Sequence, residues 1–319
     1  MHPAFSVIIF TTLSGAGFGL LACLGLCAIA GGLPDNQPFA FVSIVLALGA
    51  VTIGLLSSTF HLGHPERAWR AFSQWRSSWL SREGVVSMLT YFPALVFAGG
   101  WVLLGRSDGI FALSGLLMSV LAMLAVLCTA GIYNSLKPIP AWHNNWVLPN
   151  YLALSAMSGI LLLTALAGIF GYATKTMYAA SLALITLALI CKLAYWRFID
   201  TTPAASTPES ATGLGALGTV RLFKAPHTSE NYLMKEMGFR IARKHARKLR
   251  IISVLFGFVL PFLLLAAANM SGGVTGTGLS VAAVCLSLIG LLTERWLFFA
   301  EAKHVVTLYY GRRLDAKTH

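Results

Sequence analysis

Eight long apolar runs, separated by short polar or glycine- and proline-rich interruptions, make up most of the chain. A helix needs about 20 mostly apolar residues to cross the hydrocarbon core of a bilayer. Runs of that length lie at about residues 5–30, 39–62, 84–104, 111–134, 148–170, 177–199, 249–270 and 278–300. The pattern therefore predicts an all-α polytopic membrane protein, a bundle of eight transmembrane helices that forms a single integral membrane domain over residues 1–319.

The composition excludes two broad classes of protein. Of the 319 residues, 57% are hydrophobic and only 11% are charged, whereas an ordinary soluble domain has about 25% charged residues. A soluble enzyme and a disordered chain are therefore both excluded. The five cysteines are scattered through the apolar runs without a CxxC pair. The sequence thus predicts no disulfide framework, no zinc site and no iron–sulfur centre on this chain.

The cations are distributed unevenly between the two sides of the predicted bundle. An even number of spans places both termini on one side, and of the 23 lysines and arginines all but Arg106 and Lys175 fall on that side. Short loops rich in Lys and Arg stay in the cytoplasm. We therefore predict that both termini and the long polar loop 200–248 are cytoplasmic. The net charge of +12 then requires no nucleic-acid partner.

A basic segment, KEMGFRIARKHARKLR, ends this loop and runs directly into the seventh apolar run. Such a segment fixes topology and contacts anionic lipid. It can also dock a soluble partner, with Arg243, Lys244 and Arg247 as candidate contacts. The loop begins as a linker rich in Pro, Ser, Thr and Gly, and it has too few apolar residues to form a domain of its own. We expect it to lie against a partner protein.

Two negative observations narrow the function. The middles of the apolar runs carry almost no ionisable residues, which disfavours a transporter or a proton pump. All eight histidines lie on the predicted cytoplasmic side or at its boundary. A transmembrane haem relay needs axial ligands at two depths, so the histidines allow at most one haem near the cytoplasmic face. His61 and His64 form an HxxH pair, but Pro65 follows directly and no second pair predicts a di-metal site.

The densest group of polar residues lies between residues 57 and 84. His61 is expected to close the second helix and Glu83 to stand at the N-terminal end of the third, where a carboxylate suits the helix dipole. Both can equally be capping and snorkelling residues. Aromatic residues at helical spacing predict an interfacial amphipathic helix or, alternatively, an aromatic belt. These residues are Trp69, Phe72, Trp75 and Trp79.

The last apolar run ends with Glu294, Arg295 and Glu301 on the same predicted side of the membrane. An acidic residue about two turns inside a membrane boundary is costly unless it is paired or faces a cavity. Two interpretations stay open for these residues. Arg295 either forms a structural pair within the bundle, or the group lines a site.

Polar groups that can carry protons thus surround one end of an apolar bundle. This arrangement suits an amphiphile with an apolar tail and a polar head, and a quinone (ubiquinone or menaquinone) fits because its reduction requires two protons. His61, which titrates near neutrality, and Glu83 could supply them. The candidate quinone-binding residues are His61, Glu83, Arg67, Trp79 and His64, with Glu294 and Arg295 as possible lining residues. No catalytic residue and no metal ligand is predicted on this chain.

Four segments resemble the membrane-anchor subunit family of dimethyl sulfoxide reductase: HLGHPERA at 61–68, LSREG at 80–84, YNSLKPIPAW at 133–142 and TERWLFFAEAKHVVTLYYG at 293–311. The resemblance implies a complex of a catalytic subunit with a molybdenum cofactor, a four-cluster iron–sulfur subunit in direct contact with the anchor, and a quinone-reactive anchor without haem. In that family the histidine of the HLG motif and the acidic residue shortly after it serve the quinone site. Carried over to this sequence, they are His61 and Glu83.

The opening MHPAFSVIIFTTLSGAGFGL and the basic segment are similar to the branch of the family that serves a molybdenum sulfite dehydrogenase facing the cytoplasm. This resemblance implies a location in the inner membrane of a bacterium, where electrons from sulfite pass through the partner subunits to the quinone pool of a respiratory chain. One alternative is the anchor of a reductase for dimethyl sulfoxide or a similar S- or N-oxide, which would oxidise quinol. A purely structural anchor and a transporter are further alternatives. In none of these cases is the chain an enzyme on its own.

Overall fold

The structure is a computed structural model that describes residues 5–203, 206–221, 223–224, 240–305 and 308, without the side chains of His61, Arg240 and Ile241. It confirms the all-helical fold: the described residues contain no β-strand and form eight helices long and apolar enough to cross a membrane. The spanning helices are α1 (Phe5–Ile29), α2 (Gln37–Ser57), α3 (Trp79–Ala98), α4 (Gly109–Asn134), α5 (Val147–Ile169), α6 (Lys175–Thr201), α10 with α11 (Ala246–Val254 and Leu260–Ser271) and α12 (Gly273–Ala300).

Two of these spans contain a π-helical turn. In the seventh span, Leu255–Val259 joins α10 to α11, and Pro261 is the second residue of α11. In the third span, Gly99–Leu103 continues α3. A π turn absorbs an extra residue without ending the helix, so each of these spans remains one continuous membrane-crossing segment.

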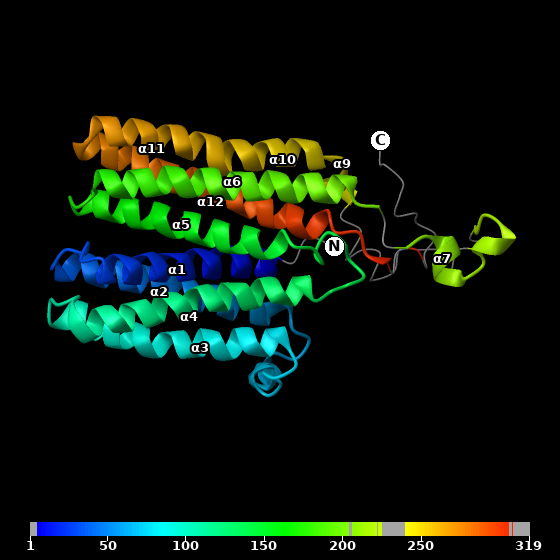
Figure 1. Cartoon of the computed structure of the whole chain (residues 1–319), viewed down its shortest axis with the longest axis horizontal. Coiled ribbons are helices and arrows are strands. Elements are labelled where there is room, and N and C mark those ends of the chain that lie inside the picture. The colour runs from blue at the N-terminus through cyan, green and yellow to red at the C-terminus, as the bar shows by residue number, and fades with distance from the viewer. Residues whose placement is uncertain (1–4, 204–205, 222, 225–239, 306–307, 309–319) are drawn as a thin grey trace.

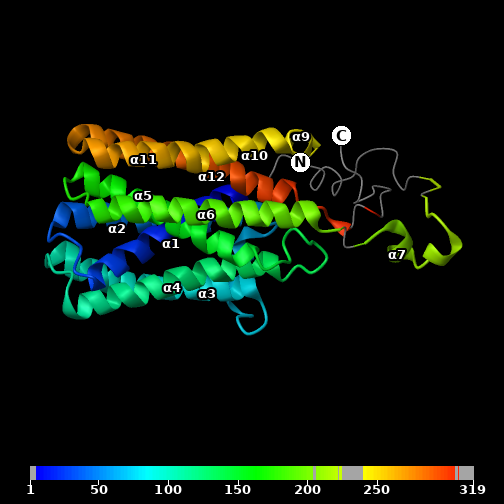
Figure 2. The ribbon, with the colours of Figure 1, turned by 45° about the horizontal axis from the view of Figure 1, so that its top comes forward.

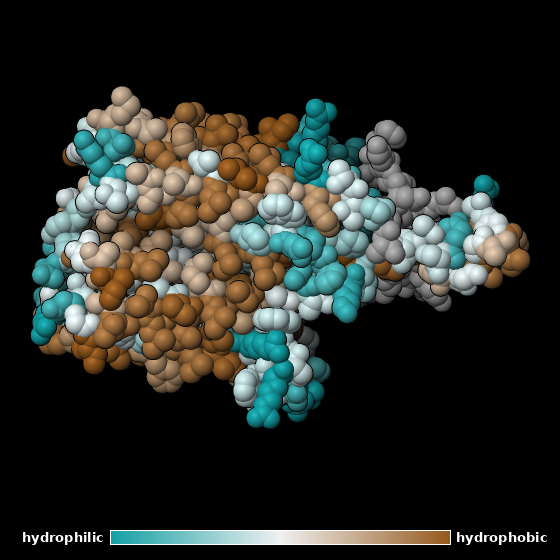
Figure 3. All heavy atoms as spheres, viewed as in Figure 1, coloured by the Kyte–Doolittle hydropathy of each residue, from teal (hydrophilic) through white to brown (hydrophobic). Residues whose placement is uncertain are grey.

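The helices lie side by side along the long axis of the molecule (Figures 1 and 2). Helices α1 and α5 are the central ones, with 72% of their most apolar window buried, against 33–39% for the other six spans. Apolar side chains cover the flanks of the bundle, and polar residues gather at its ends (Figure 3). An apolar flank is stable only against lipid, so the protein is a multi-pass membrane protein.

One end of the bundle carries most of the structure outside the spans (Figure 1). Helix α1 begins and α12 ends there, as the even number of spans requires. The short helices α7 (Pro208–Thr212) and α9 (Arg240–Lys244) and the segment before α3 lie at the same end. We call it the loop end. The predicted loop 200–248 is shorter than expected, because α6 continues to Thr201 and α10 begins at Ala246.

The third span begins earlier than the sequence predicts. Helix α3 begins at Trp79, five residues before the expected residue 84, so Glu83 lies inside the helix. The segment predicted as an interfacial amphipathic helix, or alternatively as an aromatic belt, forms a 3₁₀ helix at Pro65–Phe72 and then turns before α3. A physical reason is that the Arg82 guanidinium binds the carbonyl oxygens of Trp75 and Arg76, at 3.1 and 2.7 Å. Those carbonyls therefore face Arg82 and not a continuing helix.

Glycines allow the central helix α1 to contact its neighbours closely. A Cβ atom on Gly159 of α5 would lie 2.1 Å from the carbonyl carbon of Gly19, and one on Gly25 would lie 1.9 Å from the carbonyl oxygen of Gly115 in α4. In membranes, small residues of this kind let helix backbones approach each other. The packing of α1 against α4 and α5 therefore depends on these positions having no side chain.

Gly159→Ala is expected to destabilise the bundle by about 3 kcal/mol, because the added methyl group would meet backbone atoms that cannot rotate away. The measurement is the yield of monodisperse protein in mild detergent and its melting temperature. Gly49→Ala in α2 is the matched control, since nothing lies within 4 Å of a Cβ atom there. Equal stability of the two variants would contradict this account of the α1–α5 contact.

Candidate functional site

Glu83 is a buried carboxyl group near the loop end of α3. It is 4% exposed, and the hydroxyl of Thr129 on α4 donates a hydrogen bond to its Oε1. The Thr129 hydroxyl also lies 3.1 Å from the carbonyl oxygen of Ala125. Among the described residues, no cation lies within ion-pair distance of Glu83. A carboxyl group without a cationic partner in an apolar bundle is expensive, which points to a functional use of its proton.

Trp79 packs against α4, whereas Arg82, the neighbour of Glu83 in sequence, faces the preceding turn. The Trp79 ring is half-buried and lies so close to Gly131 that a Cβ atom there would come within 2.7 Å of it. The Arg82 guanidinium stacks on this ring, 4.5 Å from its centroid. Arg82 is therefore used to hold the turn before α3 and does not neutralise its neighbour Glu83.

The segment before α3 folds back onto the start of that helix, but its candidate residues stay at the surface. The Phe72 ring lies against Gly84. His64 and Arg67 are exposed, and both contact Glu66, at 2.9 Å from Nδ1 and 3.8 Å from Nε. The structure therefore does not bring His64 or Arg67 into a buried site with Glu83. His61 ends the 3₁₀ helix Ser58–His61, and its side chain lies outside the described part.

A second buried polar group joins α6 to α12. Lys192 Nζ lies 2.5 Å from Glu294 Oε1, and Arg295 Nε lies 2.6 Å from Glu294 Oε2. The exposed fractions of these side chains are 1% for Lys192 and Glu294 and 5% for Arg295. The expected pairing of the last acidic residues is therefore present, although its partners are Lys192 and the adjacent Arg295. We call these three residues the ion triad.

Sequence reasoning missed Lys192, which resembles one more topology-fixing cation near the end of the sixth run. The structure places its ammonium group over two aromatic rings, 4.2 Å from the centroid of Tyr195 and 4.8 Å from that of Trp196. Arg295 lies over the ring of Tyr151 at 4.1 Å. Ring faces attract cations by their negative quadrupole. The only sequence signal was a lysine enclosed by apolar residues in LICKLAYW.

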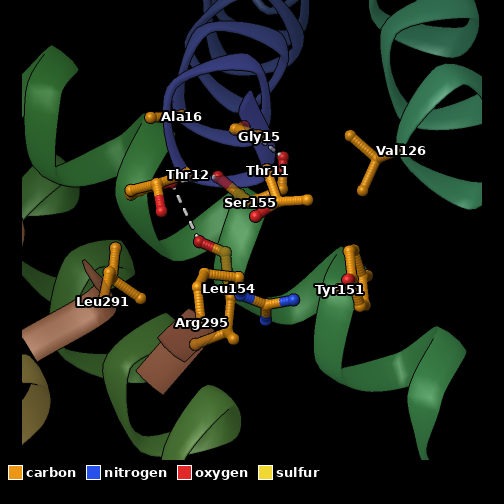
Figure 4. Close-up of a pocket in the computed structure, with 11 residues that line it drawn as sticks. Thr11, Thr12, Gly15, Ala16, Val126, Tyr151, Leu154, Ser155, Leu291 and Arg295 are labelled. Carbon is orange, nitrogen blue, oxygen red and sulfur yellow. Dashed lines mark hydrogen bonds between the residues drawn. The ribbon is translucent and has the colours of Figure 1, made fainter. Parts of the chain in front are cut away.

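A small cavity lies beside the ion triad, between α1, α5 and α12, with Val126 of α4 at its edge (Figure 4). Its volume is about 30 Å³. Thr12, Tyr151 and Arg295 line it. The Thr12 Oγ1, the Tyr151 hydroxyl and the Arg295 Nη1 are buried, and they have no hydrogen-bond partner among the described residues. These three polar atoms, from three helices, border a cavity whose lining is otherwise mostly apolar.

An ionic cluster connects this region to the surface of the loop end. Arg250 on α10 bonds Glu301 at 2.7 Å and both carboxylate oxygens of Asp200, at 2.7 and 2.9 Å. Glu301 follows α12 directly and is 9% exposed, whereas the Asp200 side chain is 55% exposed. Burial raises the pKa of Glu301, and the neighbouring Arg250 opposes this shift. We call these residues the surface cluster.

Of the three residues predicted to dock a partner, two are accessible for it. Lys244 and Arg247 are exposed. Arg243 instead bonds the carbonyl oxygens of Ala300 and Ala302, at 2.8 and 2.9 Å, and so satisfies carbonyls at the end of α12 and just beyond it. Burial, together with this arginine, lowers the pKa of His304 to about 4.

Comparison with known proteins assigns the family. The sequence matches the DMSO reductase anchor subunit (DmsC) family over residues 1–311. The chain belongs to this family. It is 35% identical to the C subunit of sulfite dehydrogenase from Allochromatium vinosum, over 97% of this sequence and 99% of that protein. It is 28% identical to the C subunit of anaerobic dimethyl sulfoxide reductase from Escherichia coli K12, over 58% of this sequence and 66% of that protein.

This anchor subunit has no cluster of metal ligands in the part that the structure describes. No three His, Cys, Asp or Glu side chains lie close enough there to hold an ion. The described cysteines are all unpaired thiols. Glu83 and the ion triad are buried ionisable groups in the described part.

Proposed function

We propose that this membrane anchor is the quinone-reactive subunit of a molybdenum and iron–sulfur oxidoreductase complex. The observation that carries the proposal is Glu83, a carboxyl group 4% exposed, held by Thr129 and without a cation in ion-pair distance among the described residues. It lies near the start of α3, at the loop end, where a proton-carrying group would be close to the water-facing end of the bundle. A quinone ring needs such a group for its carbonyl oxygen, and the apolar flank of the bundle accommodates its tail.

The residues of the site divide into two sets in this proposal. Glu83 and His61 would hold or release the protons that a bound quinone requires, since a carboxyl group and an imidazole can each carry one. Trp79 forms an apolar wall, and the exposed His64 and Arg67 form an outer rim. When bound, the quinone supplies the two-electron chemistry that the side chains of this anchor do not provide.

The complex is proposed to sit on the cytoplasmic face of a bacterial inner membrane. The loop end carries nearly all the cations, which favours its retention in the cytoplasm. An iron–sulfur subunit would contact this end, with Lys244 and Arg247 as exposed cations for docking. That subunit would connect the anchor to a catalytic subunit with the molybdenum cofactor. The proposal includes lipid contact, and neither haem nor nucleic acid.

Sulfite oxidation is the favoured direction of electron flow. The relative named as a sulfite dehydrogenase subunit is similar over nearly the whole chain, whereas the dimethyl sulfoxide reductase relative matches only 58% of it. In the favoured direction, electrons from sulfite pass to the quinone pool. The second candidate is the anchor of a reductase for dimethyl sulfoxide, which would oxidise quinol instead.

The test uses the intact complex, purified in mild detergent. We expect rapid reduction of an oxidised quinone analogue when sulfite is added, and its block by a quinone-site inhibitor. A parallel assay supplies quinol and dimethyl sulfoxide. Activity in the second assay alone would show that electrons flow from quinol to dimethyl sulfoxide. Electron transfer that resists the inhibitor and runs through another protein would show that this chain is only a structural anchor. Substrate flux into liposomes that contain this protein alone would instead indicate a transporter.

A further inference from the structure

We propose that Thr129 is a positioning residue of the quinone site. Its hydroxyl holds the Glu83 carboxyl group in one place through both protonation states, and it leaves Oε2 as the oxygen available to a quinone head. This inference rests on the proposed function, because it assumes that Glu83 gives a proton to a bound quinone. It adds to the site a residue of α4 that the sequence pattern did not single out.

The contact between Thr129 and Glu83 is buried and joins two helices. Thr129 is 5% exposed and Glu83 is 4% exposed, and the Thr129 hydroxyl bonds the Oε1 of Glu83. Among the described residues, Thr129 is the only hydrogen-bond partner of the Glu83 side chain. The place of this carboxyl group therefore depends on one hydroxyl group.

A second contact between α3 and α4 supports the first. Trp79 lies one turn before Glu83 on α3, and its ring lies 2.7 Å from where a Cβ atom on Gly131 of α4 would be. Residues four apart lie on the same face of a helix, so Trp79 and Glu83 both face α4. A packed backbone on each side keeps the hydroxyl and the carboxyl group in register.

A hydroxyl group suits a partner that changes its protonation state, because it has one hydrogen to donate and lone pairs that accept. Toward the Glu83 carboxylate, Thr129 donates. With the proton on Oε2 this bond is unchanged, since Oε1 is then a carbonyl oxygen. With the proton on Oε1 the bond reverses, and the Thr129 hydrogen turns to the carbonyl oxygen of Ala125, 3.1 Å away. Thr129 can therefore bond Glu83 in each state.

The second oxygen of Glu83 remains for the reaction. Oε2 has no hydrogen-bond partner among the described residues and is not fully buried. In the proposed step its O–H bond breaks, and a new O–H bond forms on a quinone oxygen, with electrons from the iron–sulfur subunit. Glu83 becomes a carboxylate and takes up a new proton from water before the next turnover. Thr129 neither gains nor loses a proton.

Thr129 differs in this respect from an ordinary threonine of a membrane helix. The hydroxyl of Thr90 on α3 bonds only the carbonyl oxygen of Val86, one turn earlier in the same helix, at 2.8 Å. A bond of this kind satisfies the hydroxyl locally. The Thr129 hydroxyl has such a carbonyl within reach, at Ala125, and still contacts a carboxyl group on another helix. The interhelical contact is therefore not needed to satisfy Thr129 itself.

Thr129→Val tests the inference in the intact complex, because it keeps the shape of the side chain and removes the hydroxyl. We expect kcat for sulfite-dependent reduction of a quinone analogue to fall at least about tenfold, since a misplaced reacting group is costly. The KM for the analogue and the reduction of a soluble dye at the partner subunits should stay unchanged. Thr129→Ser keeps the hydroxyl and should retain most of the activity. Thr90→Val is the matched control, a buried threonine without a contact to a carboxyl group.

Infrared difference spectra of the complex, recorded on reduction, report on the carboxyl group directly. The C=O stretching band of protonated Glu83 is identified by its loss in Glu83→Gln. In Thr129→Val this band should move to higher frequency, because the carboxyl group loses its hydrogen bond. It should stay near the wild-type position in Thr129→Ser and Thr90→Val. A role of Thr129 in packing alone would not move the band.

The outcomes separate this role from the function on which it rests. If Thr129→Val reduces quinone like Thr90→Val while Glu83→Gln is inactive, the role of Thr129 is wrong and the quinone site survives. Equal losses in Thr129→Ser and Thr129→Val, an unmoved infrared band or a loss of dye reduction would also overturn it, since Thr129 would then act through packing or assembly. If the wild-type complex neither binds nor reduces a quinone analogue, the proposed function fails, and this inference fails with it.

Discussion

A complex that carries Glu83→Gln is expected to assemble normally and to reduce quinone at least about 100-fold more slowly than wild type. Glutamine keeps the size of the side chain and can still accept a hydrogen bond from the Thr129 hydroxyl, so the packing of α3 against α4 should persist. Glutamine cannot release a proton, so the proposed quinone site would lose its buried acid. The measurement is kcat with a quinone analogue, alongside electron transfer from substrate to a soluble dye.

The dye assay separates the site from the assembly. Dye reduction occurs at the partner subunits and should be unchanged in Glu83→Gln, whereas quinone reduction should be lost. Asp108→Asn is the control, because Asp108 is an exposed carboxyl group at the start of α4 that contacts none of the proposed site residues. Full quinone activity in Glu83→Gln would remove this residue from the site. Loss of dye reduction would show that Glu83 instead supports assembly.

The position of Glu83 illustrates what the sequence could and could not reveal. The number of spans follows from the lengths of the apolar runs, and the structure confirms it. The start of α3 was placed too late because Ser81, Arg82 and Glu83 interrupt the apolar run. A hydropathy pattern cannot show that the Thr129 hydroxyl, on another helix, donates a hydrogen bond to the Glu83 carboxyl group. The two residues are 46 positions apart in the sequence.

For a similar reason, the sequence predicted only two of the three residues of the ion triad. Two of its members, Glu294 and Arg295, stand out in the last run because charges are rare there. Lys192 lies on another helix, 102 positions from Glu294, and near the end of a run where cations are common. Only the packing of α6 against α12 distinguishes a lysine that fixes topology from one that neutralises a buried carboxylate.

Glu294→Gln is expected to destabilise the folded bundle by about 3–5 kcal/mol, the usual cost of leaving buried charge without its partner. The ion triad holds two cations and one anion, all nearly inaccessible to solvent. Removing Glu294 leaves Lys192 and Arg295 as two unneutralised cations in an apolar bundle. Lys192→Met should cost much less, because Glu294 keeps Arg295 at 2.6 Å and the remaining pair is neutral. The measurement is the free energy of unfolding in mixed detergent micelles.

The double variant Lys192→Met/Glu294→Gln tests whether the unneutralised cations cause the loss of stability. Since it leaves one buried cation where Glu294→Gln leaves two, it should be more stable than Glu294→Gln alone, a rescue that simple loss of contacts does not produce. Asp108→Asn is the control for removing an acid from an exposed ion pair, and it should change stability by less than about 1 kcal/mol. If the effects of the two triad substitutions simply add, the three side chains do not act as one electrostatic unit, and Lys192 is held chiefly by the rings of Tyr195 and Trp196.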